Sequence, residues 1–102
     1  MKSWLDPTPK KDPMAVHVTI AVAGMDLAAY DQMAPALHAL VRKQPGFIIH
    51  VAYATPEGFA VGEVWDSKEQ HEAWFNKNVA PNLPSGDAVS KSYIDLHAVV
   101  EP

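Results

Sequence analysis

The 102-residue sequence contains no cysteine, which excludes disulfides, thiolate nucleophiles, iron–sulfur clusters and zinc ribbons together. Basic residues are few: the eight Lys and Arg are scattered, and the net charge is −4. A nucleic-acid surface needs clustered positive charge, so no nucleic-acid partner is expected. No apolar run approaches the roughly 20 residues of a membrane span, and the N-terminus lacks the apolar core of a secretory signal. We therefore expect no membrane partner and a cytoplasmic location.

Several chemical signatures are missing as well. The sequence has no GxSxG, no Ser-His-Asp pattern, no HExxH and no glycine-rich phosphate loop. Hydrolase and kinase functions therefore have no support. No pair of histidines has the spacing of metal ligands, so we expect neither a metal nor another cofactor.

Proline separates two parts of the chain. Residues 1–13 carry three prolines and three lysines, a composition that disfavours both helix and central strand. We interpret this segment as a flexible N-terminal arm; an extension ahead of a start at Met14 is the alternative. Residues 14–102 are about the length of one small domain.

From position 15 onward, apolar residues recur at alternate positions or at helical spacing. The patterns predict strands at 15–22, 47–54, 59–65 and 90–100, helices at 26–44 and 67–79, a hairpin turn at 55–58 and a polar loop at 82–86. Asp26 and either Asp66 or Ser67 are suited to cap the helices, and Pro35 predicts a kink or break near Ala34. The order β-α-β-β-α-β predicts an α+β, ferredoxin-like fold, with an antiparallel four-stranded sheet and both helices on one face.

Both faces of this predicted sheet carry large apolar residues. In strand 15–22 the valines and Ile20 alternate with a mixed set that includes His17 and Thr19. In strand 47–54 the alternation places Phe47 on the same face as Ile49 and Tyr53. A sheet covered on one side only would show polar residues on its outer face. We therefore expect a homodimer, in which a second copy covers the face opposite the helices.

The segment 59–81, FAVGEVWDSKEQHEAWFNKNVAP, runs from a strand through Trp65-Asp66-Ser67 into a helix that holds Trp74. It resembles the signature of the antibiotic-biosynthesis-monooxygenase (ABM) family, as do the opening strand MAVHVTIAV and the entry into the second strand, QPGF. The resemblance covers about 14–100 and implies a dimeric α+β barrel with a pocket in each subunit between sheet and helices. The family holds cofactor-free quinone-forming monooxygenases and haem-degrading enzymes, and related barrels include cyclases and isomerases, so the fold alone does not name the reaction.

The haem-degrading branch can be compared residue by residue. The spacing of Trp65 and Trp74 matches that branch, and His17 stands where it has a polar Asn. Its haem-ligating His follows the second Trp, but here the corresponding stretch 80–85 contains no histidine. Without an axial ligand, haem degradation is disfavoured.

Histidine is the side chain best suited to acid–base chemistry near neutral pH, and the sequence has five. We predict His17 as the catalytic base, on the assumption that its side of the strand faces the helices; a buried histidine bonded to a neighbour is the alternative. His71 lies one turn before Trp74 and either projects over the pocket or lies on the helix surface. His50 lies among small residues and is the third catalytic candidate.

Aromatic residues are the candidates for substrate binding. We expect Trp74, Tyr30, Trp65 and Phe75 to form an aromatic wall, with Thr19 beside His17; core packing is the alternative for each aromatic residue. Glu63 and Asp95 are unusual in apolar strands, and each either orients a histidine or lies at an exposed or interface position.

The sequence-based hypothesis is a cofactor-independent ABM-type monooxygenase that acts on a hydrophobic or aromatic small molecule, polyketide- or quinone-like. A cyclase or isomerase on the same fold, and a non-catalytic dimer that binds a small molecule, are the alternatives. In the monooxygenase version a base removes an acidic proton and the resulting carbanion reacts with oxygen.

Overall fold

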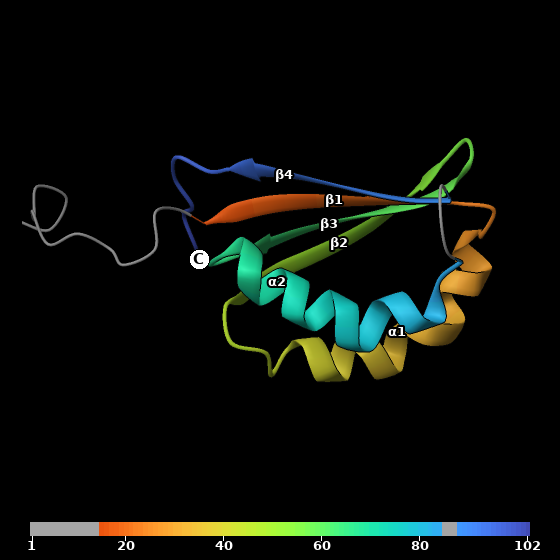
Figure 1. Ribbon diagram of the computed structural model, residues 1–102, viewed down its shortest axis with the longest axis horizontal. Coiled ribbons are helices and arrows are strands. Elements are labelled where there is room, and N and C mark those ends of the chain that lie inside the picture. The colour runs from red at the N-terminus through yellow and green to blue at the C-terminus, as the bar shows by residue number, and fades with distance from the viewer. Residues whose placement is uncertain (1–14, 85–87) are drawn as a thin grey trace, which may run out of the picture.

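The computed structural model describes residues 15–84 and 88–102 (Figure 1). The N-terminal arm predicted at 1–13 lies outside the described residues, as does part of the loop predicted at 82–86. The described elements are β1 (Val16–Ala23), α1 (Leu27–Val41), β2 (Phe47–Thr55), β3 (Gly58–Trp65), α2 (Lys68–Trp74), η2 (Phe75–Val79), η3 (Ala80–Asn82) and β4 (Val89–Asp95). They form an antiparallel sheet of order β2-β3-β1-β4, and both helices lie on one side of it. The predicted ferredoxin-like fold class is therefore confirmed.

The first helix begins and ends close to the prediction. Asp26 caps α1 by accepting a hydrogen bond from the Ala29 amide at 3.0 Å, which satisfies a free amide of the first turn. Pro35 lies inside the helix without breaking it, so the predicted break near Ala34 is wrong. Among the apolar residues of α1, Ala34 and Val41 are buried, whereas Leu27 and Leu40 are exposed.

The second helix changes its winding halfway. Of the two predicted caps, Asp66 and Ser67, it is Ser67 that caps α2, by accepting a hydrogen bond from the Gln70 amide. After Trp74 the chain continues as the π-helix η2 and then as the 3₁₀ turn η3. π-Helical turns are rare and occur often at functional sites. The predicted helix at 67–79 is thus present, but its last third has a different geometry.

The last strand is shorter than predicted. β4 pairs with β1 from Val89 to Asp95, and the Leu96 amide donates one further bond, of 2.8 Å, to the Ala15 carbonyl. Because β1 begins at Val16, the chain beyond Leu96 has no strand to pair with in the described residues. The strand predicted at 90–100 therefore ends at Asp95.

A bulge in β2 changes which residues share a face. Phe47 pairs with Trp65, and Ile49 pairs with the preceding residue of β3, Val64, so two residues of β2 oppose one residue of β3. Phe47 consequently faces the helices, whereas Ile49 and Tyr53 face the opposite side. The predicted grouping of these three residues on one face is therefore wrong, because it assumed an unbroken alternation.

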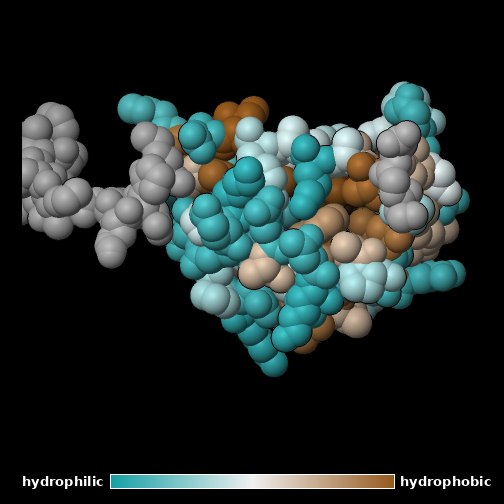
Figure 2. Space-filling view, viewed as in Figure 1, coloured by the Kyte–Doolittle hydropathy of each residue, from teal (hydrophilic) through white to brown (hydrophobic). Residues whose placement is uncertain are grey.

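The helices cover one face of the sheet and bury the core. This core consists of buried apolar side chains from β1, β3, α2 and η2 that pack against one another. They include Val16, Val18, Ile20, Val22, Phe59, Val61, Trp65, Trp74 and Phe75. In Figure 2 the helices present mostly polar surface, and apolar surface shows between them and the sheet. In the described part of the chain, no helix is long and apolar enough to cross a membrane.

Two glycines with positive φ give a stability prediction. Gly24 (φ 86°) and Gly46 (φ 89°) both adopt a backbone conformation that disfavours a side chain. A methyl group on Gly24 meets no atom within 4 Å, whereas one on Gly46 overlaps the Gln70 carboxamide. We expect Gly24→Ala to lower the free energy of unfolding by about 1–2 kcal/mol, and Gly46→Ala to lower it further.

A double-mutant cycle, with the free energy of unfolding measured in urea, isolates the cost of the overlap with Gln70. In a Gln70→Ala background, the cost of Gly46→Ala is expected to fall to that of Gly24→Ala. Equal costs for the two glycine variants in the wild-type background would contradict this prediction.

Candidate functional site

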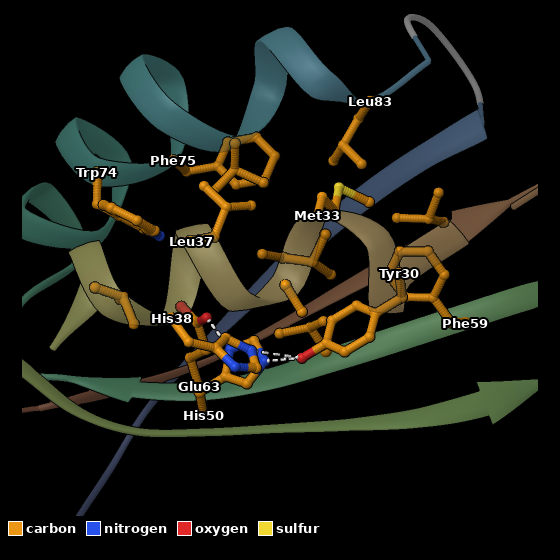
Figure 3. Close-up of a pocket in the computed structure, with 16 residues that line it drawn as sticks. Tyr30, Met33, Leu37, His38, His50, Phe59, Glu63, Trp74, Phe75 and Leu83 are labelled. Carbon is orange, nitrogen blue, oxygen red and sulfur yellow. Dashed lines mark hydrogen bonds and ion pairs between the residues drawn. The ribbon is translucent and has the colours of Figure 1, made fainter. Parts of the chain in front are cut away.

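An apolar cavity of about 60 Å³ lies between the sheet and the helices. Figure 3 shows Trp74 and Phe75 reaching in from α2 and η2, with Met33 and Leu37 on α1 and Phe59 on the sheet. The polar side chains among its described lining residues are Tyr30, His38, His50 and Glu63. Because these four gather at one end, the cavity has apolar walls and one polar end.

The strand pair β2–β3 places His50 beside Glu63. The two residues are directly opposite in the register, so their side chains lie on the same face. His50 Nδ1 is 2.5 Å from Glu63 Oε2. An ionised carboxylate only accepts hydrogen bonds, so we assign the Nδ1 proton to His50, which leaves Nε2 as its basic nitrogen.

Glu63 is 4% exposed, and two further side chains approach its second oxygen, Oε1. The Trp65 indole donates from Nε1 to Oε1 at 2.8 Å, and His71 Nε2 lies 3.7 Å from the same oxygen. A buried carboxylate is costly unless such donors surround it. The hydrogen bond from Trp65 thus fixes the carboxylate that in turn orients His50, and His71 lies close to the same oxygen without a hydrogen bond to it.

The Tyr30 hydroxyl points toward two neighbouring imidazole rings, those of His38 and His50, as Figure 3 shows. Its hydroxyl is 2.6 Å from His50 Nε2 and 2.9 Å from His38 Nε2. A hydroxyl has one proton, so it donates to one ring and accepts from the other. The side chains of Glu63, His50, Tyr30 and His38 therefore form one continuous hydrogen-bonded chain.

The surroundings hold two of these groups in their neutral forms. Burial raises the pKa of Tyr30, and the nearby Glu63 and Asp31 charges raise it further, so the phenol stays protonated. Burial lowers the pKa of His38, His50 and Arg42 lower it further, and Glu63 acts in the opposite direction. At neutral pH His38 is consequently an uncharged imidazole.

His71 is fully buried behind the cavity. Its Nδ1 is 2.7 Å from the Tyr93 hydroxyl, and its Nε2, which points toward Glu63, has no hydrogen-bond partner among the described residues. Burial lowers the pKa of His71 despite the nearby Glu63, and burial together with Glu72 raises the pKa of Tyr93 to about 12. This pair supports Glu63 from the side of β4.

The structure separates the predicted site residues into three groups. His50, Tyr30, Trp74 and Phe75 line the cavity, whereas Trp65 and His71 lie next to it and contact Glu63. His17 and Thr19 lie on the opposite face of the sheet. A methyl group on Gly62, which faces away from the helices, would lie 3.2 Å from His17 Nε2.

The assumption that the His17 side of β1 faces the helices is therefore wrong. The valines and Ile20 of β1 face them instead, because a fully apolar set is what the helical layer buries. Asp95 is exposed at the end of β4 and orients no histidine, whereas Glu63 orients His50.

His38 is the site residue that the sequence interpretation did not select. It lies two helical turns after Tyr30, a spacing that returns to the same face of a helix. That spacing was a usable signal, because both residues carry groups that form hydrogen bonds. Within residues 15–84 and 88–102, no group of three His, Asp or Glu side chains is arranged to hold a metal ion.

The sequence matches no known family model and no curated protein. Solved structures that are similar in fold include three of stated activity. SnoaB from Streptomyces nogalater, a cofactor-independent oxygenase, is 12% identical with a TM-score of 0.58 over 86% of this chain and 97% of its own. The heme-degrading protein Rv3592 from Mycobacterium tuberculosis is 22% identical with a TM-score of 0.58 over 87% and 98%. ActVA-Orf6 of Streptomyces coelicolor, a monooxygenase solved with nanaomycin D, is 16% identical with a TM-score of 0.52 over 91% and 96%.

These likenesses extend along nearly the whole length of each neighbour. The chain therefore shares its subunit fold with these three proteins, and this is the α+β, ferredoxin-like fold that the sequence predicted. At these identities the likeness establishes the fold, and the reaction has to be argued from the site.

The buried His71 gives a prediction of pH-dependent stability. In the unfolded chain a histidine titrates near pH 6.5, whereas His71 in the fold, facing Glu63, Glu72, Lys91 and Tyr93, stays neutral to lower pH. The contribution of His71 to the free energy of unfolding is complete above about pH 6.5. It is lost as the pH falls toward the folded-state pKa, because the unfolded chain then binds a proton on His71 that the folded protein does not bind.

Urea unfolding at about pH 7.5 and 5.5 measures this loss. Between the two pH values we expect the free energy of unfolding of the wild-type protein to fall by about 1 kcal/mol more than that of His71→Gln. One titrating group changes this free energy by up to about 1.4 kcal/mol per pH unit. His38 is unchanged in both proteins and cancels from the difference. Equal losses would show that His71 binds protons as readily in the fold as in the unfolded chain.

Proposed function

We propose that this protein is a cofactor-independent monooxygenase that oxidises a neutral, aromatic or hydrophobic small molecule in the cavity. The observation that carries the proposal is the Glu63–His50 pair at the polar end of an otherwise apolar cavity. The fold it shares with the oxygenases SnoaB and ActVA-Orf6 supports the same reaction class.

His50 is the proposed catalytic base. Glu63 holds the proton of Nδ1 and stabilises the imidazolium ion that forms when Nε2 accepts a proton, and its own burial strengthens that interaction. In the free protein Nε2 bonds to Tyr30. An acidic group of the substrate replaces Tyr30 there, and the Tyr30 hydroxyl keeps its second partner, His38.

The cavity lining indicates the substrate class. None of its described lining residues is Lys or Arg, and its carboxylate disfavours an anionic ligand, so the substrate is neutral when it binds. The volume is below the roughly 150 Å³ of a cavity that holds a benzene ring. A ring system therefore enters as the flexible Met33, Leu37 and Leu83 side chains move apart.

The proposed reaction converts an activated methylene group into a ketone. His50 Nε2 takes one methylene proton and leaves a resonance-stabilised carbanion. The carbanion passes electrons to molecular oxygen and forms a carbon–oxygen bond, and the proton on His50 converts the resulting peroxide into a hydroperoxide. Loss of the second methylene hydrogen with O–O cleavage yields the ketone and one water. Trp74 and Phe75 cover the aromatic rings during these steps.

Oxygen uptake with a neutral anthrone tests the proposal. We expect turnover by the wild-type protein and a loss of about 10²–10⁴ in kcat for His50→Gln, because the variant keeps the shape of the side chain without a basic nitrogen. Glu63→Gln is expected to lose activity as well. The exposed His97, changed to Gln, is the matched control and is expected to keep full activity.

Two outcomes contradict the proposal: no oxygen uptake with neutral anthrones, or uptake that survives His50→Gln. An anthrone that carries a carboxylate is expected to be a poorer substrate. Conversion of an anthrone or a related enol without oxygen would instead establish an isomerase that uses the same base.

We also propose that the protein is a homodimer that associates through the uncovered face of the sheet. Ile49, Val51, Tyr53 and Ile94 are 49–63% exposed. The register places Val51 beside Gly62 and Ile94 beside His17. Ile49 and Tyr53 alternate with Val51 along β2, so all four lie on the face away from the helices. Exposed apolar residues grouped on one surface are typical of interaction sites.

Light scattering during size-exclusion chromatography measures the association. We expect a dimer for the wild-type protein and a monomer for Val51→Lys, since a charged side chain would be buried without a partner. Leu40→Lys, which adds the same charge on the exposed side of α1, is the control and is expected to remain dimeric. A wild-type monomer at high concentration would disprove this part of the proposal.

A further inference from the structure

His17 has no part in the proposed chemistry, because it lies on the face of the sheet that the helices leave uncovered (Figure 1). Its side chain is partly buried there. The register places it in a row that crosses all four strands, in the order Ile49, Val64, His17 and Ile94. His17 is therefore the one polar member of an otherwise apolar row.

The two ends of this row belong to the surface through which the protein is proposed to dimerise. Ile49 is 52% exposed on the edge strand β2, and Ile94 is 63% exposed on the opposite edge strand β4. His17 lies between them on β1. A second copy that covers both apolar ends of the row therefore also covers His17.

The charged side chains of the strands lie on the other side of the sheet. In the described residues of β1 to β4 they are Glu63, Lys91 and Asp95, and His50 shares their side. Each of these three charged residues pairs with a buried residue of β1 that faces the helices, and His50 pairs with Glu63. The described strands therefore leave the uncovered face without a permanent charge.

The strand neighbours of His17 on the uncovered face do not titrate. They are Val64 and Gly62 on β3, and Ile94 and Ser92 on β4. On β2 the same face carries Tyr53, and a phenol does not ionise near neutral pH. Among the described strand residues of this face, only His17 belongs to the residue type that changes its charge between about pH 5 and 8.

A symmetric dimer brings no opposite charge to His17. In a two-fold interface the second copy presents the same face, so the strands of both copies contribute the same groups. A neutral imidazole can be covered by such a surface at a modest cost. A protonated imidazole would be buried without an acidic partner, which is strongly unfavourable.

We propose that His17 makes the association of two copies depend on pH: the dimer forms while both His17 side chains are neutral and separates as they bind protons. The inference rests on the proposed dimer and is independent of the proposed chemistry. Because the separated subunits bind these protons and the dimer does not, a falling pH shifts the equilibrium toward separate subunits. Each His17 gains one proton from water, and no other covalent bond changes.

The dissociation constant of the dimer, measured by sedimentation equilibrium at about pH 7.5 and 5.5, tests the proposal. We expect the constant of the wild-type protein to rise at least about tenfold at the lower pH, since each of the two histidines contributes up to about tenfold per pH unit. In His17→Gln we expect the same constant at both values, because the amide does not titrate. His97→Gln, which removes an exposed histidine, is the control and is expected to respond like the wild-type protein. Circular dichroism at both values restricts the comparison to folded subunits.

Two further variants keep the test decisive if the Gln side chain disturbs the interface. His17→Lys carries its charge at both pH values, so we expect separate subunits at both. His17→Leu is expected to remain dimeric at both. A wild-type constant that does not change with pH, or that rises equally in His17→Gln and His17→Leu, would overturn the inference alone. Separate wild-type subunits at about pH 7.5 would overturn the proposed dimer, and this inference with it.

Discussion

The Glu63 carboxylate lies under the helical layer and is held by side chains from three directions. Trp65 donates to one oxygen, His50 donates to the other, and His71 approaches from α2. Burial of a charge is unfavourable unless donors of this kind compensate it. Its position on the central strand β3 consequently determines the tautomer of His50, the direction of the Tyr30 hydrogen bond and the orientation of His71. A neutral residue at this position would leave His50 without the carboxylate that orients its imidazole.

The same arrangement gives the two faces of the sheet different tasks. The face toward the helices combines an apolar core with one polar cluster, which suits selective binding of a neutral aromatic molecule. The opposite face carries exposed apolar residues of β2 and β4, which suits association with a second copy. Helix α1 links the interior to the surface, because Tyr30 points to the base and His38 borders the groove.

The sequence predicted the order of the four strands and two helices, because the alternating and helical patterns are strong and the caps Asp26 and Ser67 fit them. It did not predict the π-helical and 3₁₀ geometry of η2 and η3. It did not determine which side of β1 faces the helices, so His17 was chosen over His50. The bulge after Phe47 has no local signal in composition. The pairing of His50 with Glu63, however, follows from a two-residue turn between Thr55 and Gly58, counted back along both strands. The hydrogen-bonded chain of Glu63, His50, Tyr30 and His38 was not predictable from patterns, since it depends on contacts between elements far apart in the chain.

The most direct test of the account is a crystal structure of the protein with a hydroxylated anthraquinone, an analogue of the expected product. The account predicts that the ring system lies in the cavity beside Trp74 and Phe75. One of its oxygens should be within hydrogen-bond distance of His50 Nε2 or the Tyr30 hydroxyl, while Glu63 still bonds to His50. A ring system bound on the opposite face of the sheet, or a filled cavity that excludes it while His50 stays bonded to Tyr30, would contradict the account.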